Sequence, residues 1–199
     1  MAKMREISPA LNVSANAFFS LMPSEFQAIV SRIRAEKESG TRSKPSSALI
    51  DKSEMLTPTR RKALLDRVAL FVDENLAGRS EMCIQFAALL SRGLKHMGFD
   101  SKAVTGTATY FSTKGKQVFS WNHAWIRIGR EVVDGNSDSL SENIMVPETV
   151  HAAPYWGPIK DVPGRFLHEN GYVQDDSDVV NIWWPELKDW LENEFLQLP

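Results

Sequence analysis

The chain has 199 residues, of which 43% are hydrophobic and 24% charged, the balance of an ordinary globular protein. A net charge of -2 gives no electrostatic basis for binding nucleic acid or an anionic membrane, and one cysteine cannot form an internal disulfide. No stretch has the length of a transmembrane helix, and the N-terminus lacks the apolar run of a secretory signal, so we expect a cytoplasmic protein or one exported without a cleaved signal.

The first fifty residues predict one helix followed by a polar connection. Between Pro23 and Ser39 apolar residues recur at helical spacing, and Gly40 ends the pattern. Residues 39–54 are polar and rich in serine, which is typical of a linker or an exposed loop. We therefore expect an N-terminal helical segment and linker over residues 1–50, and one larger domain over residues 51–199 with a C-terminal helix.

Two helices are predicted next. The first begins at Thr57 and Pro58, residues suited to a helix N-terminus, and Gly78 ends it. Its buried face is expected to contain Leu64, Leu65, Val68, Phe71, Val72 and Leu76. The second begins near Ser80 and ends at Gly98. Its apolar stripe contains Cys83, Phe86, Ala87, Leu90, Leu94 and Met97, so the only cysteine lies in the first turn of a helix.

Strands follow the two helices. Residues 101–112 and 116–138 are rich in valine, isoleucine, threonine and aromatic residues, with turns predicted at Lys114-Gly115 and Gly129-Arg130. Residues 146–167 contain four prolines and are predicted to be mostly loop, and a last helix is expected to open at Pro185. Helices followed by antiparallel strands predict an α+β fold and not a doubly wound one.

Cys83 has two interpretations. A lone cysteine on an apolar helical stripe is most often a small core residue. At a helix N-terminus, however, free amides and the helix dipole favour a thiolate, and a backbone N–H there can stabilise an oxyanion. A thiolate nucleophile also needs a base, and the base needs a group that orients it.

His123 is the histidine best placed to be that base. His96 lies thirteen residues further along the helix of the cysteine, roughly 20 Å away, and cannot reach the sulfur. If Ile128 pairs with Glu131 across the predicted turn, His123 shares a sheet face with Asp134 and Asn136. Asp134 is then a diagonal neighbour of His123 and Asn136 lies opposite it, so either side chain can orient the imidazole. Asp138 is a weaker candidate for the same role.

Three motifs in this order resemble the transglutaminase-like superfamily of papain-type thiol enzymes: "SEMCIQFAALLSRGLKHMGFD" around Cys83, "NHAWIRI" around His123, and "EVVDGNSD" around Asp134. The resemblance covers roughly residues 57–140. It implies a papain-like core in which the helix of the cysteine packs on an antiparallel sheet that carries His123 and Asp134. It also implies a Cys83–His123–Asp134 catalytic triad, with Trp121 as a candidate for an oxyanion-stabilising tryptophan.

The resemblance implies cysteine-dependent chemistry at an amide or another acyl carbon of a peptide or protein substrate. Hydrolysis by a peptidase or glutamine deamidase is the leading expectation, and transamidation is the other outcome. No cofactor motif and no metal-ligand spacing is found, so neither group is expected. Two alternatives remain: a non-catalytic binding module with the same fold, and an acyltransferase similar to the arylamine N-acetyltransferases, whose signature is only faintly matched by Arg79 and Cys83.

Overall fold

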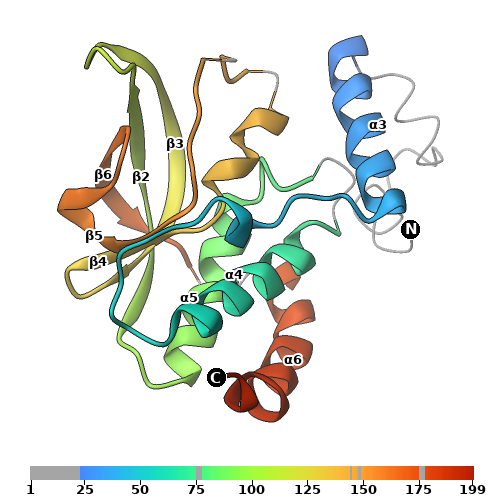
Figure 1. Cartoon of the computed structure of the whole chain (residues 1–199), viewed down its shortest axis with the longest axis vertical. Helices are drawn as coiled ribbons and strands as arrows, with labels where there is room; N and C mark the ends of the chain where they lie inside the picture. The colour runs from blue at the N-terminus through green and yellow to red at the C-terminus, as the bar shows by residue number, and fades with distance from the viewer. Residues whose placement is uncertain (1–22, 75–77, 144, 148, 175–177) are drawn as a thin grey trace. The chain divides into compact units, whose positions relative to one another are not determined.

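A computed structural model describes residues 23–74, 78–143, 145–147, 149–174 and 178–199, and it shows a mixed α+β fold, as the sequence predicts (Figure 1). By its internal contacts the chain divides into two compact units, residues 1–42 and residues 43–199. None of the helices in the described ranges combines the length and the apolar character that crossing a membrane requires.

The described part of the first unit contains helix α3, Ser24–Ser39. Val30 and Ile33 are its buried residues, in agreement with the helical spacing of the sequence. The helix ends as predicted at Gly40, which adopts a left-handed conformation with φ of 69°. Glycine suits this position because it has no Cβ to clash in that conformation.

The second unit is built on a sheet. Within the described residues its strand order is β1-β5-β4-β3-β2-β6. The strands are β1 (Ile50–Asp51), β2 (Ser101–Phe111), β3 (Gln117–Ile128), β4 (Glu131–Asp134), β5 (Tyr155–Pro158) and β6 (Arg165–Tyr172). Neighbouring strands are antiparallel except β1 and β5, which run parallel, so the expectation of a wholly antiparallel sheet is wrong at this edge.

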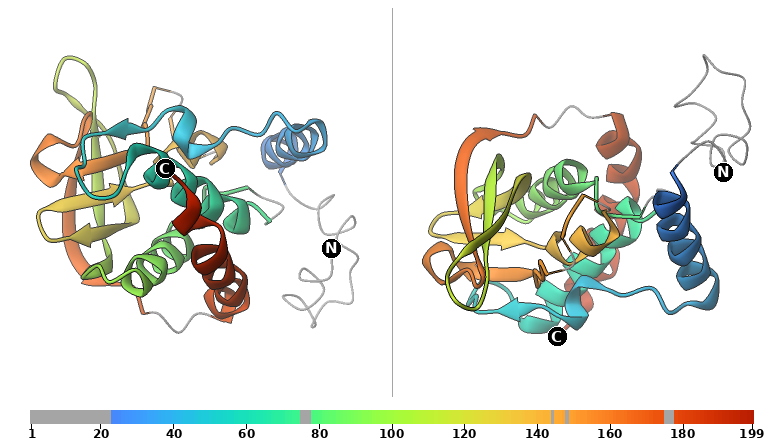
Figure 2. Two further views of the ribbon diagram at one scale, coloured as in Figure 1. Left: turned by 60° about the horizontal axis from the view of Figure 1, so that its bottom comes forward. Right: turned by 90° about the horizontal axis from the view of Figure 1, so that it is seen from above.

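Three helices cover one face of this sheet: α4 (Pro58–Val72), α5 (Cys83–His96) and α6 (Asp178–Asn193) (Figures 1 and 2). Thr57 caps α4 as predicted, because its hydroxyl oxygen accepts a hydrogen bond from the Arg60 amide at 3.3 Å. Helix α5 packs directly on β2 and β3, and α4 and α6 pack against α5, so that the three apolar stripes share one core with Ala124 and Ile126 of β3. Burial of this area is the main source of stability for a domain of this size.

The other face of the sheet carries a second apolar cluster. Val104, Tyr110 and Trp125 belong to it, and it is covered by Leu140, Val146 and Val150 from the segment after β4. The short 3-10 helix η2 (Ser137–Glu142) opens that segment. The sheet therefore has a core on both faces, and this is why several of its strands carry few exposed residues.

Several predicted boundaries are wrong. Helix α4 ends at Val72, and Leu76 lies outside the described residues. Strand β5, η3 (Ile159–Asp161) and the first three residues of β6 lie in the region predicted as mostly loop. Helix α6 begins at Asp178 and contains Pro185, and η4 (Phe195–Gln197) follows it.

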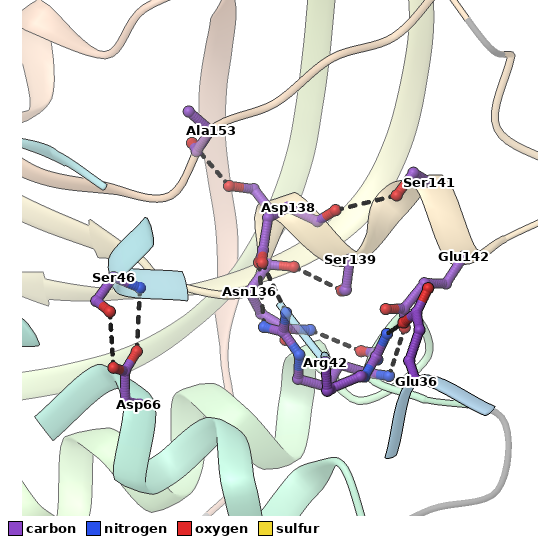
Figure 3. A network of polar contacts seen from close by, with 12 residues as sticks. Glu36, Arg42, Ser46, Asp66, Asn136, Asp138, Ser139, Ser141, Glu142 and Ala153 are labelled. Atoms are coloured by element: carbon purple, nitrogen blue, oxygen red, sulfur yellow. Dashed lines mark hydrogen bonds and ion pairs between the residues drawn. The ribbon is translucent and has the colours of Figure 1, made fainter. Parts of the chain in front are cut away.

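The predicted linker is not a free loop along its whole length. It contains η1 (Pro45–Ser47) and β1. The Ser46 backbone amide and hydroxyl donate to the Asp66 carboxylate at 3.0 and 2.7 Å (Figure 3). These bonds attach the segment to α4.

Candidate active site

Cys83 is the first residue of α5. The residues before it, from Gly78, form a turn, so the helix begins three residues later than the sequence suggested. The first N–H groups of a helix have no acceptor within the helix, and they make this end electropositive. Cys83 itself is partly buried, and the next residue, Ile84, is 46% exposed. The sulfur is therefore held at the helix end, close to the protein surface.

His123 lies on β3 in the predicted register. Ile128 pairs with Glu131 across the Gly129-Arg130 turn, so the simple two-residue hairpin forms without a bulge. The His123 ring is buried, and its Nε2 lies 2.8 Å from Oδ1 of Asp134. Because Nε2 is used in this contact, Nδ1 is the nitrogen left for Cys83. Of the candidates for the residue that orients His123, the structure thus brings Asp134 to the imidazole.

The two other candidates contact a different partner. The Asn136 side-chain amide donates to the Arg79 carbonyl at 2.7 Å. The Asp138 carboxylate accepts two hydrogen bonds from the Arg79 guanidinium, at 3.1 and 2.6 Å. The Arg79 amide donates to Glu142 at 2.8 Å. These contacts fasten the turn before Cys83 to η2, and Figure 3 shows Asn136, Asp138 and Glu142 among the side chains of this network.

Residues 134–142 consequently hold both sides of the site. Asp134 binds the histidine, and Asn136, Asp138 and Glu142 bind the turn that leads into the cysteine helix. Arg79 is 1% exposed, so its paired charge is almost fully removed from water. A buried arginine without its carboxylate is strongly unfavourable, so Arg79 must stay paired with Asp138. The two parallel hydrogen bonds of this pair fix the position of the turn relative to η2.

Arg165 is a site residue that the sequence did not reveal. It lies on β6, and its Nε and a terminal nitrogen lie 2.8 and 2.7 Å from Oδ2 of Asp134. Both side chains are almost completely buried. Arg165 is charged and follows a proline-rich stretch, so no hydrophobic periodicity marks it as an inward-facing strand residue. Along β6 the buried Arg165 alternates with the exposed Phe166. Asp134 therefore lies between two partners, His123 and Arg165.

A cavity of about 290 Å³ opens beside Cys83 and His123. Its other lining residues are Ile84, Thr105, Gly106, Asn122 and Asn170. Thr105 pairs with Gly171 and Gly106 with Glu169, so Asn170 is the extra residue of a β-bulge in β6. Bulges of this kind redirect side chains next to functional sites. The bulge places a carboxamide-bearing residue at the wall of the pocket, opposite the strand that carries His123.

Gly106 provides the space for this arrangement. Its strand partner on β3 is His123. A Cβ at Gly106 would lie 2.1 Å from the His168 carbonyl oxygen and 2.5 Å from the ring of Trp125. The indole of Trp125 and the backbone of β6 both approach the missing side chain, so only glycine fits between them.

The charges of the site support each other. Burial disfavours the charged imidazole, but the charge and hydrogen bond of Asp134, together with Cys83, outweigh it and raise the pKa of His123 from 6.5 to about 10. Burial also raises the pKa of Asp134, but Arg165 and then His123 lower it from 3.8 to about 2. At neutral pH the site therefore holds an imidazolium beside the cysteine and an ionised carboxylate behind it.

The remaining singled-out residues lie elsewhere. Trp121 stacks on Phe119, with ring centroids 5.7 Å apart, and does not line the cavity. His96 lies on α5 and is ion-paired with Glu192 at 3.0 Å. Trp183 and Trp190 of α6 are buried in the apolar core that the helices share with the sheet.

In comparisons with known proteins, no protein-family model, no curated protein and no solved structure matches this chain.

Proposed function

We propose that this protein is a thiol enzyme with a transglutaminase-like core that hydrolyses an amide bond in a peptide or protein substrate. The observation that carries the proposal is the lining of one small cavity by Cys83 and His123, with the far nitrogen of His123 bound to a buried carboxylate. A core cysteine needs neither a cavity nor an oriented histidine. Both are required when the sulfur acts as a nucleophile.

The proposed reaction begins with attack of the Cys83 sulfur on the carbonyl carbon. The Cys83 backbone N–H, free at the start of α5, donates to the oxyanion that forms. His123 then gives its proton to the leaving amine as the carbon–nitrogen bond breaks, and a thioester remains. Water attacks this acyl-enzyme while His123 takes up one of its protons. As the carbon–sulfur bond breaks, the thiolate and the acid product separate, and the thiolate–imidazolium pair is restored.

The lining of the cavity fits a neutral substrate. Asn122 and Asn170 supply exposed carboxamides, and Thr105 supplies a hydroxyl, so hydrogen bonds to a peptide group are available there. The lining contains no lysine or arginine, so beyond the His123 imidazolium, which is paired with Asp134, it offers no cation to a phosphate-bearing acyl carrier. This favours a peptide substrate over the acyltransferase alternative. The preference for water as the acceptor comes from the superfamily resemblance.

The first test is the pH dependence of Cys83 alkylation by iodoacetamide. An ordinary thiol is less than about 1% ionised at pH 6, so a thiolate–imidazolium pair should react about 100-fold faster there. His123→Ala should abolish that advantage. His96→Ala is the matched control, because His96 lies on the same helix and forms an ion pair outside the site.

A second stage uses substrate. Peptides with side-chain and main-chain amides should release ammonia or a new amine with the wild type and not with Cys83→Ser.

An alkylation rate that rises only near pH 8 to 9 and is the same in His123→Ala would refute the proposal. The cavity would then be better explained as the groove of a binding module.

A further inference from the structure

Arg165 is more tightly fixed than an ion pair with Asp134 alone requires. One of its terminal nitrogens donates to the Ala153 carbonyl at 3.1 Å and to the Ser137 hydroxyl at 3.3 Å, in addition to its contact with Asp134. Its side chain is 1% exposed. Since the guanidinium has several fixed acceptors, it cannot move away from Asp134 without breaking contacts to two neighbouring segments. It therefore acts as a rigid support for the carboxylate.

The charge of His123 changes during the proposed reaction, but the charge of Arg165 does not. When His123 gives its proton to the leaving group, the neutral imidazole no longer compensates the buried Asp134 carboxylate. A buried carboxylate without a cation tends to take up a proton, which would leave Asp134 a poor acceptor for the imidazole N–H. An arginine remains protonated throughout the accessible pH range, so Arg165 compensates Asp134 in both states of His123.

The other groups around Asp134 carry no positive charge. Tyr110 on β2 has its pKa raised by burial and by Asp134, and Tyr155 on β5, the strand partner of Asp134, has its pKa raised to about 12 by burial, Asp161 and Glu131. The Ser137 hydroxyl, which donates to the Asp134 backbone carbonyl at 3.4 Å, is also neutral. In the described part of the chain, His123 and Arg165 are the two cations that stabilise the ionised Asp134.

We infer that Arg165 is a positioning residue: it keeps Asp134 ionised and directed at His123 while the histidine gives up and regains its proton. This inference rests on the proposed function for its role in turnover. The electrostatic part, that Arg165 maintains the His123–Asp134 hydrogen bond, holds for the folded protein with or without a substrate.

The test measures the ring N–H proton of His123 by NMR on the full chain with ¹⁵N-labelled histidine, from pH 8 downward. His123→Ala assigns the signal. In the wild type the signal should persist to low pH, because Asp134 stays ionised there. In Arg165→Gln it should disappear at least one pH unit higher. Arg165→Lys, which keeps the charge but loses the second donor to Asp134, should lie between the two.

Arg127→Gln is the matched control. Arg127 is also a strand arginine paired with a carboxylate, Glu169 at 3.0 Å, but it does not contact Asp134. In Arg127→Gln the His123 signal should disappear at the same pH as in the wild type. Loss of the signal at one common pH in the wild type and Arg165→Gln would overturn the inference, as would an equal shift in Arg127→Gln.

A second measurement covers the case in which Arg165→Gln does not fold. The ¹³C chemical shift of the Asp134 carboxyl carbon is followed in the wild type with ¹³C-labelled aspartate and assigned with Asp134→Asn. It should keep the value of an ionised carboxylate below pH 3. Titration near the ordinary value of 3.8 would overturn the inference. These readouts do not depend on the thiol. If alkylation of Cys83 is ordinary while the His123 signal shifts as expected, the proposed function fails and the electrostatic role of Arg165 stands.

Discussion

Replacing Gly106 and Gly93 by alanine should have opposite effects on stability. Alanine at Gly106 brings its Cβ to 2.1 Å from the His168 carbonyl oxygen and 2.5 Å from Trp125. The first neighbour is backbone, so β6 itself must move. Overpacking a core costs about 1–3 kcal/mol, and we place this substitution at the upper end, about 3 kcal/mol, because a strand pairing is displaced with the side chain.

Gly93 is the control within the same domain. Its added Cβ would meet Leu191 at 3.5 Å and Leu187 at 3.6 Å, which is ordinary packing contact. Since Gly93 lies inside helix α5, alanine there should stabilise the protein by about 0.5–1 kcal/mol.

The assay is thermal unfolding followed by circular dichroism, with urea unfolding for the free energies. For a protein of this size 1 kcal/mol corresponds to about 2–4 °C, so Gly106→Ala should lower the midpoint by about 6–12 °C and Gly93→Ala should raise it by about 1–4 °C. Equal midpoints for Gly106→Ala and the wild type would show that β6 does not approach β2 as closely as described, and the account of the bulge would fail with it.

Two further predictions concern the charges of the site. Asp138→Asn should lower the free energy of unfolding by about 3 kcal/mol, because it leaves the buried Arg79 with a neutral partner, and it should also slow Cys83 alkylation. Glu169→Gln, which breaks the more exposed pair with Arg127, should lower it by less than about 1 kcal/mol. Urea unfolding of the two variants would test this, and equal losses would contradict it. Because folding raises the pKa of His123, the stabilisation from its charge is complete below pH 6.5 and is lost as the pH rises towards 10. Because folding lowers the pKa of Asp134, the stabilisation from its carboxylate is complete above pH 3.8 and is lost as the pH falls towards 2. The unfolding free energy should therefore fall on the alkaline side by at most about 1.4 kcal/mol per pH unit for this one proton, and a profile in which His123→Ala keeps the same alkaline decline would refute the assignment.

That His123 and Asp134 share one face of the sheet could be predicted because their pairing is local. Gly129-Arg130 is a short turn with a defined register, and the alternation of side chains along the two strands then determines which residues share a face. The start of the cysteine helix was predictable to within three residues for a similar reason. Thr57 and Gly40 also acted as the sequence indicated, because capping depends on one side chain or one backbone conformation.

The parts that were missed depend on distant contacts. Strand β5 is four residues long, follows Pro154 and ends at Pro158, and it forms because its two neighbours, β1 and β4, supply hydrogen bonds. Strand β6 carries Arg165 at an inward position, and the compensating charge of Asp134 comes from 31 residues earlier in the chain. In sequence, Asn136 was an open alternative to Asp134 and Asp138 a weaker one, but both bind the Arg79 turn, which is far from them in the chain.

The row formed by Cys83, His123, Asp134 and Arg165 has a consequence for the conditions in which the protein works. With the sulfur ionised, the charges along this row alternate in sign and sum to zero. The carboxylate, the imidazole and the guanidinium are nearly inaccessible to water, and buried pairs of this kind are screened little by dissolved ions. A balanced arrangement of this type projects only a weak field into the cavity, so it neither attracts nor repels a substrate according to charge. Its chemistry should therefore proceed equally well in dilute and in concentrated salt.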